Sequence, residues 1–150
     1  RYSFFQECGI RWYRTMNLTD EEREALVIAR KARAFDTWEE TKGIVECGYW
    51  HAAANRMYYA CFHIVSALLI LNNIEVKSHM GVRQAFGLHF VKTNLLPSDC
   101  GRIFSKIYDK RQASDYDDFR EFTKEEVNNL YPQVLFLINE VDKLIDCNLK

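Results

Sequence analysis

The chain has 150 residues, 48% of them hydrophobic, and a formal net charge of −1. This balance gives no overall field that attracts nucleic acid or an acidic membrane, so such binding would require a local patch. With only six Gly and two Pro, the composition favours one compact, all-α domain over residues 19–150.

Residues 1–18 lie before the first clear helix and show neither a helical nor an alternating period. Five aromatic residues and three arginines fall within the first 14 positions. We interpret the segment either as a leader or as an arm that packs on a partner subunit, and its sequence does not distinguish the two. It lacks the smooth apolar stretch of a signal peptide, which predicts a cytoplasmic protein.

The first predicted helix extends from Thr19 to about Glu46. Thr19 and Glu22 have the spacing of a capping box, in which each residue's side chain accepts the other's backbone N–H. Apolar residues then recur on one face, and Cys47-Gly48 ends the helix. Because the next helix follows after a very short turn, we expect the two to pack as antiparallel neighbours.

The central predicted helix, residues 50–72, is the most apolar long segment of the chain. Its length would suffice to span a bilayer. However, Asn55 and Arg56 interrupt it, and such residues are costly in a lone membrane helix. We therefore predict that it is the most buried helix of a soluble bundle, without membrane contact.

The polar residues of this central helix form a stripe. At about 100° per residue, their side chains fall within an arc of roughly 100° on an otherwise apolar cylinder. The stripe consists of Asn55, Arg56, Tyr59, His63 and Ser66, and His51 lies just outside it. It is either the least buried side of the helix or one wall of a ligand groove shared with another element.

A shorter helix is predicted over residues 79–92, after a loop at 74–78. No acidic residue occurs between Glu75 and Asp99, whereas lysine, arginine and histidine residues, His79 among them, do. This is the only locally basic stretch suited to phosphate binding. A solvated helix face is the alternative interpretation.

Arg111 continues the apolar face of the following helix, for which Ser98 is the expected N-cap. A charged residue in that place either extends toward solvent at a helix end or is directed into a site. Asp115 lies four residues later and Tyr116 follows it. The three groups could form only a local ion pair, or they could bind phosphate, act as a base and stack on a nucleobase.

The last predicted helix starts at a second capping box, Thr123 with Glu126. Its apolar residues recur at heptad-like spacing from Val127 to Ile145, a stripe that suits packing within a bundle or across a dimer. Pro132 lies off this stripe, so we expect a kink there and no break in the packing face.

The five cysteines, at positions 8, 47, 61, 100 and 147, show no C-x-x-C spacing. Free thiols in a reducing cytosol fit this set better than disulfides or zinc. The histidines and carboxylates show no metal-binding pattern, and no glycine-rich phosphate loop is present. We expect neither a metal nor a cofactor.

Three blocks of sequence together resemble the HEPN (higher eukaryote and prokaryote nucleotide-binding) family. They are ANRMYYACFHIVSALL, then KSHMGVRQAF with HFVKTNLLP, then RQASDYDDF. More narrowly, they are similar to the bacterial and archaeal branch that has N-R-x-Y-Y-A and R-x-x-x-D-Y motifs. The resemblance covers residues 20–146.

The resemblance implies an up-and-down bundle of about five helices that forms a homodimer, with the two active clefts at the interface. Many members are metal-independent ribonucleases, often toxins encoded beside a minimal nucleotidyltransferase. Their nuclease motif is an arginine followed, after four to six residues, by a histidine. Arg111 matches that arginine, whereas Tyr116, Asp117 and Asp118 occupy the positions of the histidine.

Two functions therefore stand open. One is that of an RNA- or nucleotide-binding, ribonuclease-like toxin component, and the other is that of a non-catalytic dimeric module for a nucleotidyltransferase partner or a nucleotide ligand. For the first function, the candidate catalytic residues are Arg111, Asp115 and Tyr116, and the candidate ligand-binding residues are Asn55, Arg56, Tyr59 and His79. We expect Arg111, with Asp115 and Tyr116, to lie close to the polar stripe, chiefly to Asn55, Arg56 and Tyr59.

Overall fold

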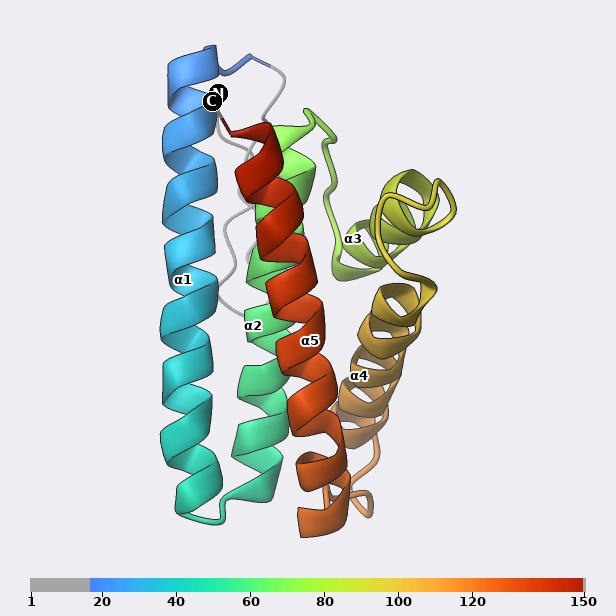
Figure 1. The fold of residues 1–150 in the computed structure, drawn as a ribbon. Coiled ribbons are helices and arrows are strands. Elements are labelled where there is room, and N and C mark those ends of the chain that lie inside the picture. Colours follow the sequence, from blue (N-terminus) through green and yellow to red (C-terminus); the bar gives the residue numbers. More distant parts are fainter. Residues whose placement is uncertain (1–16, 150) are drawn as a thin grey trace.

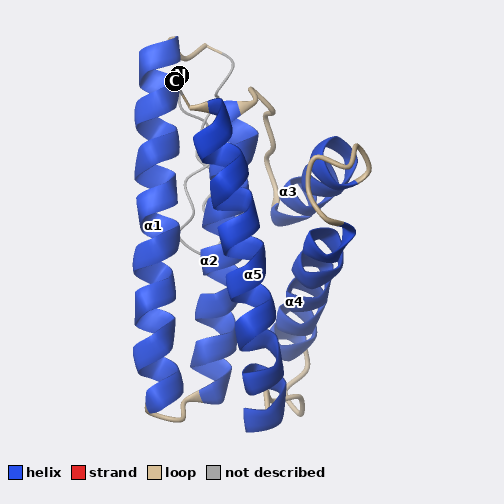
Figure 2. Cartoon of the chain, viewed as in Figure 1, coloured by secondary structure: helices blue, strands red, loops and turns tan. Residues whose placement is uncertain are grey.

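The computed structural model describes residues 17–149, and every regular element in that part of the chain is a helix (Figure 1). They are α1 (Asp20–Glu46), α2 (Trp50–Leu71), α3 (His79–Phe86), the π-helical turn η1 (Gly87–Val91), α4 (Ser98–Tyr116) and α5 (Lys124–Asn148). The predicted all-α bundle of about five helices is confirmed (Figure 2). The aromatic leader, apart from its last two residues, lies outside the described residues.

α2 lies at the centre of the bundle. It packs against α1 and α5 as long neighbours and against α4 and α3 on another side (Figure 1). Every residue from Met57 to Ile70 is buried. Among the described helices, α2 alone is long and apolar enough to cross a membrane, and 83% of its apolar window is buried within the protein. Packing against the other described helices thus covers most of its apolar surface.

The turn between α1 and α2 is built around Gly48. Its φ of +77° lies in the left-handed region that glycine adopts without strain. The Gly48 N–H donates to the Val45 carbonyl at 3.0 Å, and the Tyr49 N–H donates to the Ile44 carbonyl at 3.3 Å. The chain thereby reverses within residues 47–49, and α1 and α2 pack antiparallel as predicted.

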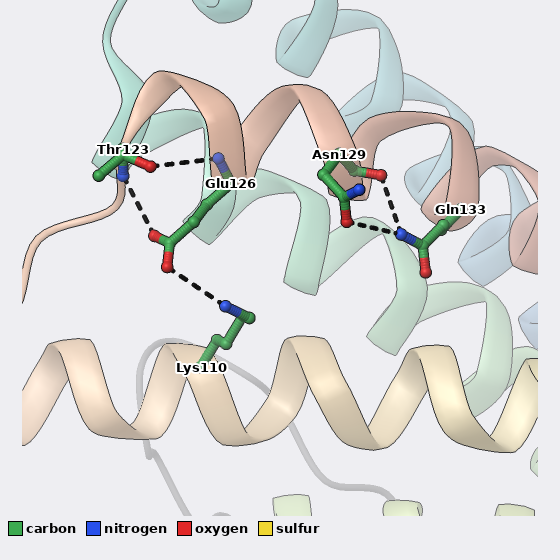
Figure 3. A network of polar contacts seen from close by, with 5 residues as sticks. All are labelled: Lys110, Thr123, Glu126, Asn129 and Gln133. Atoms are coloured by element: carbon green, nitrogen blue, oxygen red, sulfur yellow. Dashed lines mark hydrogen bonds and ion pairs between the residues drawn. The ribbon is translucent and has the colours of Figure 1, made fainter.

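Both predicted threonine N-caps form, but of the two predicted capping boxes only the one at α5 is reciprocal. The Thr19 hydroxyl accepts a hydrogen bond from the Glu22 N–H at 3.1 Å. At α5 the capping box is reciprocal, because Thr123 Oγ1 accepts from the Glu126 N–H at 3.2 Å and Glu126 Oε2 accepts from the Thr123 N–H at 3.2 Å. Lys110 of α4 donates to the other carboxylate oxygen at 3.3 Å and so ties the two helices together (Figure 3). The Thr123 N–H is the main cause of the lowered pKa of Glu126.

Thr123→Ala should lower the free energy of unfolding by about 1 kcal/mol, because the Glu126 N–H then loses its side-chain acceptor. Urea denaturation measures this change. Glu126→Gln keeps an acceptor for the Thr123 N–H and should therefore have a clearly smaller effect. A Thr123→Ala protein as stable as the wild type would contradict the capping role.

The apolar stripe of α5 packs within the bundle. Its buried members are Val127, Leu130, Val134, Leu137, Ile138, Val141 and Ile145. α5 continues through Pro132 as one helix, and the expected kink there stays a prediction. Since the stripe is used inside one chain, it does not supply a dimer surface.

The start of α4 differs from the prediction. Pro97, not Ser98, occupies the N-cap position, and Ser98 is the first helical residue. The Pro97 carbonyl accepts the Cys100 N–H at 3.0 Å, which starts the helical turn one residue early. Proline suits this place because it has no N–H that requires a partner.

The helix predicted over residues 79–92 is α-helical only to Phe86 and continues as the π-helical η1. The Lys92 N–H donates to the Gly87 carbonyl, five residues back, at 2.9 Å. The apolar spacing of so short a segment does not distinguish the two hydrogen-bond patterns.

Candidate functional site

Arg111 lies buried near the end of α4, on the side that faces α2. Phe104 and Ile107 precede it on the same face and belong to the core, and Arg111 itself is only 8% exposed. Its Nη2 donates to the Tyr59 hydroxyl at 3.1 Å. The guanidinium carbon lies 4.7 Å from the centroid of the Tyr58 ring and 5.0 Å from that of Tyr59, within the cation–π range. Two aromatic residues of α2 thus hold the cation in place.

Asp115 is the counter-ion of Arg111 within the same helix. Arg111 Nη2 and Asp115 Oδ2 are 3.2 Å apart, and the aspartate side chain is 32% exposed. Tyr116 follows at a position about 140° around the helix from Arg111 and is 85% exposed. The structure therefore brings the predicted aspartate, but not the predicted tyrosine, to the guanidinium. We call Arg111, Asp115, Tyr58 and Tyr59 the arginine cluster.

His79, at the start of α3, reaches the arginine cluster through Tyr58. The Tyr58 hydroxyl oxygen and His79 Nδ1 are 2.7 Å apart. Burial raises the pKa of Tyr58 far above its usual value, so the hydroxyl keeps its proton while it shares this hydrogen bond with the imidazole. The His79 ring also packs against Phe62, with centroids 4.7 Å apart. His79 thus positions one of the two rings that hold Arg111.

The predicted polar stripe of α2 divides between two neighbouring helices. Tyr59 contacts α4, whereas Arg56 forms an ion pair with Glu40 of α1, Nη2 to Oε2 at 2.6 Å. Asn55 is half-buried one turn before Tyr59. Arg111 thus meets the stripe at Tyr59, as expected, whereas the ion-pair partner of Arg56 lies on α1. An arc of about 100° is too wide to face a single helix.

His63 lies on the same side of α2 as Arg56. It is 8% exposed, and neither its Nδ1 nor the hydroxyl of Ser66 has a hydrogen-bond partner in the described part of the chain. Burial, followed by the charges of Arg30, Arg33 and Arg56, lowers the pKa of His63 to about 3. The imidazole is therefore neutral at physiological pH.

One polar contact beside the cluster was missed by the sequence analysis. His51 of α2 and Ser114 of α4 meet, with Nδ1 and Oγ 3.0 Å apart. The Ser114 hydroxyl also donates to the Arg120 carbonyl at 3.3 Å. The His51 ring lies beside the Phe122 ring, with centroids 6.1 Å apart. His51, an exposed residue of α2, thereby contacts both α4 and the segment that follows α4.

The spacing of residues on α2 could have revealed this histidine. His51, Asn55 and Tyr59 follow one another at intervals of four, which places them in one row along the helix. Ser114 lies three residues after Arg111 and shares its face of α4. The two rows contact each other at both ends, through Tyr59 with Arg111 and through His51 with Ser114. Arg111 lies at the buried end of the paired rows and His51 at the exposed end.

The described residues offer neither a metal cluster nor a reactive buried thiol. No group of three or more His, Cys, Asp or Glu side chains within residues 17–149 is arranged to hold a metal ion. Cys61 and Cys100 are buried free thiols. Burial raises the pKa of Cys100 to about 11 and that of Cys61 still further, so neither is a thiolate at neutral pH.

Known proteins match most of the chain. Residues 28–144, which include the arginine cluster and His51, match the family model of the HEPN domain. A UPF0332 protein of Thermotoga maritima is 30% identical over 83% of this chain and 95% of its own length. Two Methanocaldococcus jannaschii proteins named as candidate toxins are each 31% identical, one over 75% of this chain and 77% of itself, the other over 83% and 90%. The chain therefore belongs to the HEPN domain family.

Proposed function

We propose that the arginine cluster binds RNA and that the protein is the toxin component of a toxin–antitoxin pair. The relatives named as candidate toxins support the second part of this proposal. The first part rests on one observation, which is a buried arginine held by two tyrosines whose carboxylate partner is partly exposed.

A phosphate group can replace Asp115 beside Arg111. The aspartate contacts the guanidinium from the next turn of the helix, and with 32% exposure it can turn toward solvent. A guanidinium binds two phosphate oxygens at once through its planar fork. Because the rings of Tyr58 and Tyr59 already fix Arg111, little side-chain freedom is lost when the anion binds.

Exposed aromatic side chains beyond the end of α4 favour an unpaired RNA strand over a free nucleotide. Tyr116 is 85% exposed and Phe119 is 98% exposed. Such rings stack on the bases of a single strand. Asp117 and Asp118 lie between them and weaken any general attraction for the backbone, so we expect stacking and the Arg111 contact to supply the affinity.

We further propose a homodimer and a minimal nucleotidyltransferase as its antitoxin partner, on the basis of the family. A non-catalytic dimeric module that serves such a partner is the second candidate function. It is favoured by the ion pair that Asp115 already makes with Arg111. It is also favoured by Tyr116, Asp117 and Asp118, which occupy the positions of the histidine in the ribonuclease motif.

Arg111→Ala should weaken the binding of a fluorescently labelled single-stranded RNA by about 10- to 100-fold, because hydrogen bonds to a charged group contribute about 1.5–3 kcal/mol. Fluorescence anisotropy measures the affinity, and thermal melting reports on the fold. Arg102→Ala is the matched control, since Arg102 lies on the same helix with its side chain 56% exposed. It should bind RNA as the wild type does.

The opposite result would identify a structural brace. In that case Arg111→Ala lowers the melting temperature, while the folded fraction binds RNA with unchanged affinity. Such an outcome would reject the RNA site and favour the non-catalytic module.

A further inference from the structure

We propose that His51 is the proton acceptor in cleavage of the RNA that Arg111 binds, and that Ser114 is its positioning residue. The inference rests on the proposed RNA site and adds a residue that lies outside the arginine-to-histidine motif. Its starting point is the contact at 3.0 Å between His51 Nδ1 and Ser114 Oγ.

The hydrogen bonds of Ser114 decide which ring nitrogen of His51 carries the proton. A serine hydroxyl has one hydrogen to donate and can also accept. That hydrogen goes to the Arg120 carbonyl at 3.3 Å, so the bond at 3.0 Å is donated by His51 Nδ1–H. In the neutral imidazole, Nε2 then carries the lone pair and can accept a proton.

The imidazole is held in place and still accessible. Phe122, itself only 8% exposed, lies beside the ring at 6.1 Å between centroids. Ser114, which holds the ring by its hydrogen bond, lies on α4, one turn beyond Arg111 and next to Asp115. His51 is exposed at the second residue of α2, so an RNA strand held at Arg111 can reach it.

The other three histidines do not fit this role. His63 is buried among arginine charges on the α1 side of α2. His79 is buried and its Nδ1 is occupied by the Tyr58 hydroxyl. His89 is exposed, but it belongs to η1, which precedes the first turn of α4, whereas Arg111 lies in the last two turns.

The proposed step balances within the RNA and the protein. The 2′-hydroxyl gives its proton to Nε2 of His51 as its oxygen bonds to the adjacent phosphorus. The bond from phosphorus to the 5′-oxygen breaks with its electron pair, and that oxygen takes a proton from water. The hydroxide that remains takes the proton from Nε2 of His51, which returns the imidazole to its neutral form. The products are a 2′,3′-cyclic phosphate and a 5′-hydroxyl. Arg111 stabilises the negative charge that develops on the phosphoryl oxygens.

His51→Gln should reduce the cleavage rate of a bound single-stranded RNA by about 10²- to 10⁴-fold and change its affinity less than twofold. His89→Gln is the matched control and should cleave as the wild type does. In His51→Ala, added imidazole should restore part of the rate, which a purely structural residue would not show. Ser114→Ala should lower kcat by about tenfold at unchanged KM, and Ser114→Thr should restore it.

Each outcome separates the histidine from the binding site. Wild-type protein that binds the RNA through Arg111 without forming a cyclic phosphate would overturn the role of His51 and leave the RNA site intact. Equal cleavage by His51→Gln and wild type would do the same. Loss of cleavage in His51→Gln, combined with unchanged RNA affinity in Arg111→Ala, would support the histidine and reject the proposed RNA site.

Discussion

Acidification from pH 7 to pH 4 should remove about 3 kcal/mol of folding stability through His63 alone. Burial and the neighbouring charges of Arg30, Arg33 and Arg56 lower the pKa of this imidazole in the folded protein from 6.5 to about 3. Between those two values the unfolded chain binds a proton that the folded chain does not. Stability therefore falls as the pH drops below 6.5, and the loss levels off near pH 3.

Urea denaturation at pH 7 and pH 4 measures this contribution. Carboxylates with ordinary pKa values also begin to take up protons toward pH 4, so the informative quantity is the difference between variants. His63→Leu should lose about 3 kcal/mol less than the wild type on acidification, whereas His89→Leu, an exposed control, should lose as much as the wild type. Parallel losses in the wild type and His63→Leu would mean that His63 titrates normally in the folded state.

Tyr58→Ala should lower the free energy of unfolding by about 3–5 kcal/mol, the range for removal of a buried aromatic ring. Tyr58 is fully buried and stacks on Phe104, with centroids 6.4 Å apart. Its ring also lies 4.7 Å from the Arg111 guanidinium carbon, so its loss leaves a cavity beside a buried cation. Calorimetry or urea denaturation measures the change.

Two further variants separate the contributions of Tyr58. Tyr58→Phe keeps the ring and removes only the hydroxyl that is hydrogen-bonded to His79, which should lower stability by about 1–2 kcal/mol. Tyr116→Ala, at a tyrosine that is 85% exposed, should stay within about 0.5 kcal/mol of the wild type. A Tyr58→Ala effect no larger than that of Tyr116→Ala would contradict the packing described for α2.

Features that depend on neighbours in the sequence were predictable. Thr123 and Glu126 are three residues apart, so their capping box follows from local geometry. The spacing of Arg111 after Phe104 and Ile107 placed it on the inner face of its helix, and left open whether its side chain extends to solvent or, as the structure has it, is buried. Ser98 was wrongly predicted as the N-cap because α4 begins one residue earlier, with Pro97 at that position.

Features that depend on the direction of a side chain between helices were not predictable. Arg56 and Tyr59 are three residues apart on one stripe, yet one contacts α1 and the other α4. The row of His51, Asn55 and Tyr59 could have pointed to the histidine, but its partner Ser114 is 63 positions away and no local pattern joins the two. Such pairings depend on the relative positions of neighbouring helices. The periodicity of residues along one helix does not specify those positions.

The central place of α2 has a consequence for synthesis of the chain on the ribosome. α2 is made before α3, α4 and α5, the helices that pack on the sides that α1 leaves open, so that α1 alone can shield it at first. From Leu71 to Asn148 the ribosome must add 77 residues (148 minus 71) before α5 is complete. At about 5–20 residues per second this takes roughly 4–15 seconds. During that time the nascent chain exposes the apolar surface that chaperones bind.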